Sequence, residues 1–223
     1  MIRQTLHAVP IALTVLSAQA VISAQAAVSA PAETCVRADG EPQLLWGDLH
    51  VHTSLSLDAY AFGSIATPAD AYRFARGESL TLDTGETVSI ERSLDFAAVT
   101  EHAATLDLMH TCVDPLNSDL AYCRTIRDLR QQRIPRDIFN NYLLPIVSLT
   151  PPTRPEICDE VDCDAARKSQ WQRIQEAAND ANEPCEFTTL IGYEWTPSPG
   201  GQHWHRNVIY RTDSVPDQVF DLS

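Results

Sequence analysis

The sequence is poor in positive charge. Its 223 residues include 16 Lys and Arg against 30 Asp and Glu, which gives a formal net charge of -14 at pH 7. Proteins that bind nucleic acid neutralise many phosphates with basic side chains. The shortage therefore argues against a nucleic-acid partner. A phosphate-bearing small molecule would need local positive charge, which a bound metal could supply.

Long apolar stretches are also missing beyond residue 30, so no later segment is expected to span a bilayer, which takes about 20 apolar residues. The start of the chain is different: Arg3 stands without an acidic neighbour, residues 8–27 are almost wholly small or apolar, and several Ala-x-Ala sites follow. This order is typical of a signal peptide, and its proline and glutamines make a membrane anchor the weaker alternative. We expect residues 1–30 to be cleaved, residues 31–43 to form a linker, and the product to be periplasmic or secreted with no stable membrane anchor.

No two cysteines have the CxxC spacing, so a zinc knuckle is not expected. An even number of cysteines after a signal peptide indicates disulfides instead. The short separations favour Cys112–Cys123 and Cys158–Cys163, and elimination then leaves Cys35–Cys185.

The remainder, residues 44–223, is expected to form one domain with a cysteine-stapled insertion at about 110–163. Apolar runs predict strands over 44–52, 94–100, 187–193 and 206–211. Helices are expected over 67–77, with Thr67 as the cap and Pro68 at the first position, over 125–132, and over 164–182. Strands that alternate with helices predict an α/β fold with a mainly parallel sheet or barrel.

Histidines and acids gather where these strands end. The clusters are Asp48-Leu49-His50-Val51-His52, Glu101-His102, Glu194, and His203-Trp204-His205-Arg206-Asn207. Alternate residues of a strand share a face, so two imidazoles at i and i+2 can reach one ion. Barrel enzymes place their chemistry at the carboxyl ends of strands. A buried carboxylate among imidazoles needs compensation, which a cation supplies. Each cluster alone is a weak signal, and the four together indicate a metal site.

These motifs resemble those of the PHP (polymerase and histidinol phosphatase) superfamily. Gly47-Asp48-Leu49-His50-Val51-His52-Thr53, with Ser56 and Asp58, resembles its first motif. Residues 96–102 resemble the second motif, although Glu101 stands where Asp is usual, and residues 190–194 resemble the strand whose Glu bridges metals. Residues 46–59, 194–196 and 203–210 are more closely similar to the domain-of-unknown-function family 3604, a PHP-like group of exported proteins.

The resemblance implies a PHP-type distorted (β/α) barrel, incomplete in this chain, with a centre of two or three ions. His50, His52, His102, Glu194 and one of His203 and His205 would be ligands, with His205 preferred because it lies nearer the following strand. The candidate catalytic acids are Asp48, Glu101 and Asp58, and Asp58 is also a candidate ligand. Ligation by His and carboxylate favours Zn, Mn or Fe. His110, beside Cys112, is expected to be a loop residue.

The function expected from this centre is hydrolysis of a small molecule, such as a phosphorylated one, by metal-activated water, as in a phosphoesterase. An amidohydrolase-like enzyme is one alternative, but the only lysine, Lys168, is on a predicted polar helix face and does not suit its usual bridging role. A non-catalytic metal-binding protein is the other. Because later PHP ligands have no counterpart after Tyr210, we also expect this chain to be the amino-terminal part of a longer protein and a poor enzyme alone.

Overall fold

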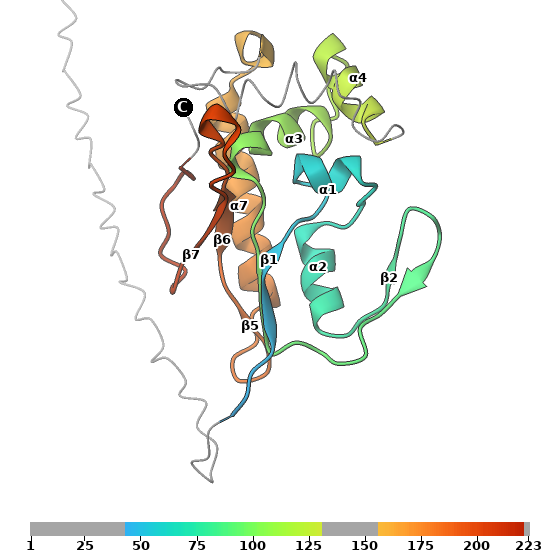
Figure 1. The fold of residues 1–223 in the computed structure, drawn as a ribbon, viewed down its shortest axis with the longest axis vertical. Coiled ribbons are helices and arrows are strands. Elements are labelled where there is room, and N and C mark those ends of the chain that lie inside the picture. Colours follow the sequence, from blue (N-terminus) through green and yellow to red (C-terminus); the bar gives the residue numbers. More distant parts are fainter. Residues whose placement is uncertain (1–42, 131–155, 221–223) are drawn as a thin grey trace, which may run out of the picture. The chain divides into compact units, whose positions relative to one another are not determined.

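A computed structural model describes residues 43–130 and 156–220 (Figure 1). The predicted signal peptide and almost all of the predicted linker lie outside these ranges. No helix within them is long and apolar enough to cross a membrane. The fold is mixed α/β, as the alternation of elements predicts, and the described residues form no closed barrel.

Short strands and one long helix make up most of the structure. The strands are β1 (Gly47–Val51), β2 (Leu80–Thr81), β3 (Thr87–Val88), β4 (Phe96–Val99), β5 (Thr188–Thr189), β6 (Gly192–Trp195) and β7 (Arg206–Ile209). The α-helices are α1 (Leu57–Ala61), α2 (Pro68–Ala75), α3 (Leu106–Cys112), α4 (Ala121–Asp128) and α7 (Cys163–Ala181). Turns of 3-10 helix lie at Ala103–Thr105, Glu156–Asp159 and Pro199–Gly201.

The central sheet has the order β1-β4-β5, and both strand pairs are parallel. Beyond β4 the chain continues beside β6 through a parallel bridge between His102 and Glu194. Gly47 lets β1 and β4 approach closely, because an added Cβ would collide with the ring and carbonyl of Phe96. The parallel core of the sheet thus agrees with the prediction.

The direction of β7 does not agree with a mainly parallel arrangement. β7 pairs antiparallel with β6, and Glu194 lies opposite Asn207. The short connection over residues 196–205 explains this, since a parallel return needs a crossover of a dozen or more residues. The predicted strand 187–193 is also divided into β5 and β6.

Helix α2 begins as its sequence predicts and ends at Ala75, two residues before the predicted end. Thr67 and Asp70 form a capping box, and Pro68 occupies the first turn. Tyr72 on this helix is fully buried, and its hydroxyl oxygen accepts a hydrogen bond of 3.1 Å from the Val99 backbone N–H in β4. This contact ties α2 to the sheet.

Helix α7 packs against α2 and α3 and lies behind the strands in Figure 1. The predicted inner face of α7 is buried: Trp171, Ile174 and Ala178 join the core next to the sheet. A second hydrophobic cluster lies under α1, α3 and α4, and it contains Leu57, Tyr60, Met109, Cys112, Cys123, Ile126 and Cys163.

Both short-range disulfides are present. Cys112 is bonded to Cys123, and Cys158 to Cys163. Cys185 is disulfide-bonded as well, and its predicted partner, Cys35, lies outside the described residues.

In the insertion, one local prediction is wrong and one is confirmed with shifted bounds. His110 lies within α3 and is buried, because the apolar side chains around it continue the helical pattern into the second cluster. The helix expected over 125–132 begins earlier, and α4 covers Ala121–Asp128.

Candidate metal centre

The Glu194 carboxylate, only 1% exposed, is surrounded by imidazoles from several segments. The nearest nitrogens are His205 Nδ1 at 2.6 Å, His52 Nε2 at 2.7 Å, His50 Nε2 at 3.0 Å and His102 Nδ1 at 3.5 Å. Glu194 is thus the shared neighbour of four histidines.

Asp58 contacts two of the same histidines. Its carboxylate lies 3.1 Å from His52 Nδ1 and 3.3 Å from His102 Nε2. The potential ligand atoms form three overlapping groups, within each of which they lie no more than 4.8 Å apart. These groups are His50–His52–Glu194, His52–Asp58–His102 and His102–Glu194–His205.

The fold explains why these residues meet. His50 lies in β1, His52 just after it, and His102 shortly after β4, so all three mark the carboxyl ends of neighbouring parallel strands. Glu194 comes from β6, and the antiparallel return through β7 brings His205 to the same end. The Asn207 side chain donates a hydrogen bond of 2.8 Å to the Leu49 carbonyl, which joins β7 to β1.

The buried atoms of the cluster fit a cation. Glu194 Oε1 and His52 Nε2 are buried and have no hydrogen-bond partner, although each lies within 2.7 Å of a polar atom of the cluster. The contacts are close but are not aligned as hydrogen bonds. Since buried polar atoms normally have partners, and buried carboxylates need compensating charge, a metal ion shared by these atoms would satisfy both requirements.

The electrostatics of the metal-free cluster lead to the same interpretation. Burial alone would lower the pKa of His52, but the neighbouring Asp58 and Glu194 carboxylates outweigh it and raise that pKa to about 10. Burial would raise the pKa of Glu194, yet the neighbouring imidazoles lower it to about 2. The pKa of Asp58 is likewise lowered by His102 and His52 against the effect of burial. Without a metal, a proton on His52 supplies positive charge that an ion would replace.

Three predicted site residues are not brought into these groups. Asp48 is exposed, and its carboxylate accepts the His50 backbone N–H at 2.9 Å. Glu101 is fully buried, and its carboxylate is bound by Thr53 and Ser56. His203 Nδ1 lies 3.4 Å from His205 Nε2 and reaches none of the other members. Between His203 and His205, the structure brings His205 to Glu194, as the sequence favours.

One neighbour of the cluster was not predicted. The Thr196 hydroxyl lies 2.7 Å from His102 Nδ1 and orients that ring. Its position two residues after Glu194, on the same face of an extended chain, is the signal that would have indicated it.

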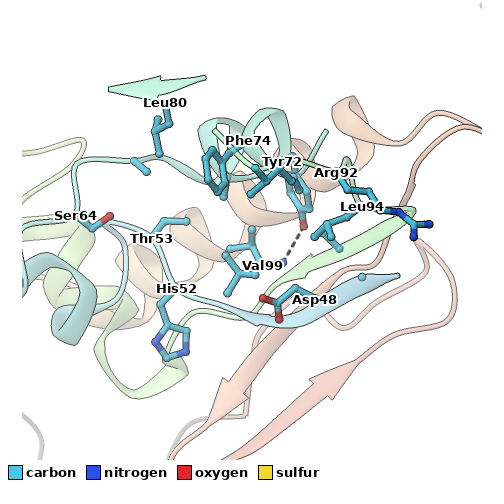
Figure 2. A pocket seen from close by; sticks show the side chains of 17 residues that line it. Asp48, His52, Thr53, Ser64, Tyr72, Phe74, Leu80, Arg92, Leu94 and Val99 are labelled. Carbon is cyan, nitrogen blue, oxygen red and sulfur yellow. Dashed lines mark hydrogen bonds between the residues drawn. The ribbon is translucent and has the colours of Figure 1, made fainter. Parts of the chain in front are cut away.

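A fourth grouping, Asp107 with Cys158 and Cys163, does not form a comparable site. Its cysteines are bonded to each other, so they offer no thiolate. A pocket of about 500 Å³ also lies along β1, mostly lined by apolar residues of α2 and the sheet. Asp48 and His52 are among the residues that line this pocket (Figure 2), so the pocket borders the cluster at His52.

A comparison with protein families identifies the family of this chain. The model of a family described as "Protein of unknown function (DUF3604)" matches residues 39–223. The chain belongs to this family. No curated protein and no solved structure matches it. The DUF3604 match includes every residue of the three candidate ligand groups.

Proposed function

We propose that this DUF3604 chain is an exported, metal-dependent hydrolase of the PHP superfamily that acts on phosphoesters. The observation that carries the proposal is the buried Glu194 carboxylate with four imidazoles, next to Asp58, in overlapping three-residue groups. The PHP resemblance of the same residues connects this centre with a distorted (β/α) barrel, of which the described strands would form one part.

The three groups would hold two or three divalent ions. A mixture of imidazole and carboxylate suits Zn, Mn or Fe better than Mg or Ca. Such ions lower the pKa of coordinated water and neutralise charge that develops on a phosphoryl group. This local positive charge is what a protein of net charge -14 needs to bind an anionic small molecule.

The side chains of the cluster have separate tasks. Glu194, His52 and His102 form its buried floor, whereas the His50 side chain is 57% exposed and that of Asp58 41%. A substrate would therefore approach past His50 and Asp58. Thr196 fixes the His102 ring at Nδ1, which leaves its Nε2 facing Asp58.

The amidohydrolase-like alternative has little support from the described residues. Its usual bridging lysine would have to be Lys168, but that side chain is partly exposed on α7 and forms an ion pair of 3.2 Å with Asp217. Export is supported by the disulfides, which persist in oxidising compartments, and by the signal-peptide pattern.

The test uses the chain after metal removal and reloading with Zn, Mn or Fe. Phosphomonoesters, phosphodiesters and amides are offered in parallel, and metal content is measured by elemental analysis. We expect phosphoester hydrolysis that depends on added metal and is lost in Glu194→Gln but kept in His203→Ala. Metal-dependent cleavage of amides alone would favour the amidohydrolase class. A loaded protein without any hydrolysis, in this chain and in any longer product of its reading frame, would indicate a binding protein.

A further inference from the structure

The Glu101 carboxylate is completely buried, and its hydrogen bonds come from the loop after β1. The Thr53 backbone N–H lies 3.1 Å from both carboxylate oxygens, and the Thr53 hydroxyl donates to Oε1. The Ser56 hydroxyl donates to Oε2 at 2.5 Å. With both oxygens occupied by these donors, Glu101 has no role as a ligand in the arrangement seen.

Each residue in this network borders a candidate ligand. Thr53 follows His52 directly, and Ser56 precedes α1, whose second residue is Asp58. Glu101 precedes His102, whose backbone N–H donates to the Ser56 hydroxyl oxygen at 3.0 Å. The network therefore connects the backbone at His52, Asp58 and His102, which are the three members of one ligand group.

We infer that Glu101 is a positioning residue for the ion held by His52, Asp58 and His102. It fixes the loop after β1 against the end of β4, so that three ligands from two segments face one point. The inference rests on the proposed metal centre. The other two groups each take Glu194 from β6, and one of them also takes His205, so part of their support comes from the β6–β7 pair.

Both the length and the charge of Glu101 matter to this role. Its carboxylate has to span from β4 to Thr53 and Ser56 at once, and an aspartate would fall short by about the length of one methylene. Glu101→Asp therefore keeps the charge and loses the reach. Glu101→Gln keeps the reach but replaces one accepting oxygen with a donating amide, which cannot receive the hydroxyl and N–H bonds on both sides.

The experiment is a titration of the metal-free chain with Co²⁺, in which the number of ions, their affinities and the absorption spectrum are recorded. We expect both Glu101 variants to weaken one ion by about 10- to 100-fold, the usual effect of losing a hydrogen bond that orients a ligand. The remaining Co²⁺ should be weakened less, because the other two groups share only His52 or His102 with this one and also draw on Glu194. Asp58→Asn should weaken the same ion, and combining it with Glu101→Gln should add little.

The matched control is Asp107→Asn. Asp107 is also a buried carboxylate, but it binds Arg167 at 2.9 Å and lies in none of the three groups. This variant is expected to lower stability while keeping the wild-type number of Co²⁺ ions and their affinities.

Unchanged Co²⁺ binding in both Glu101 variants would overturn the inference, and so would a uniform loss of all ions, which would mean that Glu101 only supports the fold. A wild-type chain that binds no Co²⁺ would instead refute the metal centre itself. If the Glu101 variants do not fold, Thr53→Val removes one donor to the carboxylate and should show the same selective loss. Thr53→Ser restores the hydroxyl and should restore the ion, and equal binding by these two variants would count against the inference.

Discussion

The surroundings of Glu101 and Glu194 differ in kind, although both carboxylates are almost inaccessible to solvent. Around Glu101, N–H and hydroxyl groups of one loop donate to both oxygens. Around Glu194, ring nitrogens of four histidines from three segments approach closely, and Oε1 has no hydrogen-bond partner. The first environment completes a structural anchor, whereas the second leaves lone pairs directed at a place that an ion can fill.

The pKa values follow the same division. Burial raises the pKa of Glu101 above its usual range in spite of the hydrogen bonds that it accepts. The pKa of Glu194 falls to about 2, because imidazoles outweigh the effect of burial. Position in the sequence does not separate these two glutamates, since each ends a buried strand. Their donors do.

The largest expected effect comes from Glu194→Gln. This change removes the charge on which two of the three ligand groups depend, so the affinity for metal should fall by about 100-fold or more. Wild-type protein should melt at a higher temperature when Zn²⁺ is added, since a ligand that binds the folded state stabilises it. The variant should show little such shift in a calorimetric scan. A full shift in the variant would show that Glu194 holds no ion.

The amount of metal lost when a histidine is replaced should increase with the burial of that histidine. His102 belongs to two ligand groups and its side chain is 12% exposed, whereas His50 belongs to one group and is largely exposed. We expect His102→Ala to lower metal content more than His50→Ala, as measured by elemental analysis of the dialysed proteins. Wild-type stoichiometry in both variants would refute the ligand assignment.

Glu101→Ala should act on stability even without metal. It leaves buried donors of Thr53 and Ser56 without an acceptor, and each such loss costs about 1–3 kcal/mol. We expect the free energy of unfolding in a chelator to fall by about 3 kcal/mol, whereas Glu194→Gln should change it much less. Urea denaturation of the metal-free proteins measures both. Equal losses in the two variants would remove the distinction between anchor and ligand.

Much of the centre is readable from sequence because the decisive patterns are local. His50 and His52 are adjacent on one extended segment, the capping box of α2 spans four residues, and both short-range disulfides close small loops. The preference for His205 over His203 likewise rested on its distance from the following strand. Local geometry is enough in all of these cases.

The rest depends on contacts between distant segments. Nothing near Glu101 shows that its carboxylate meets Ser56, 45 residues earlier, instead of an ion. The short connection over residues 196–205 makes β7 antiparallel once β7 pairs with β6, but the choice of β6 as partner is a contact that the sequence does not show. His110 is helical because its neighbours in α3 pack into the second hydrophobic cluster. The nearby cysteine does not indicate this packing in the sequence.

Both short-range disulfides lie in the second hydrophobic cluster, beneath α1, the helix that carries Asp58. In a chain-entropy model a crosslink that closes a longer loop stabilises more, about 3 kcal/mol for the separation of 11 residues in Cys112–Cys123 and about 2 kcal/mol for that of 5 in Cys158–Cys163. Replacing the first pair by serines should therefore lower the melting temperature more than replacing the second.

Thiol titration of the denatured, unreduced protein should find no free cysteine, and two or more would contradict the disulfide framework.

The smallest expected effect is that of His203→Ala, and it defines the edge of the ligand shell. His203 contacts only His205 within the cluster, whereas His205 Nδ1 lies 2.6 Å from Glu194 Oε1. Substitutions outside such a shell usually change free energies by less than about 0.5 kcal/mol, which corresponds to a factor of about two in affinity. His205→Ala removes a member of a ligand group and should weaken metal binding by about tenfold or more. Parallel Co²⁺ titrations of the two variants decide the assignment, because both remove one imidazole from the same loop and differ only in its distance from Glu194. Equal losses would mean that the loop positions both rings on the ion, and a larger loss in His203→Ala would reverse the assignment.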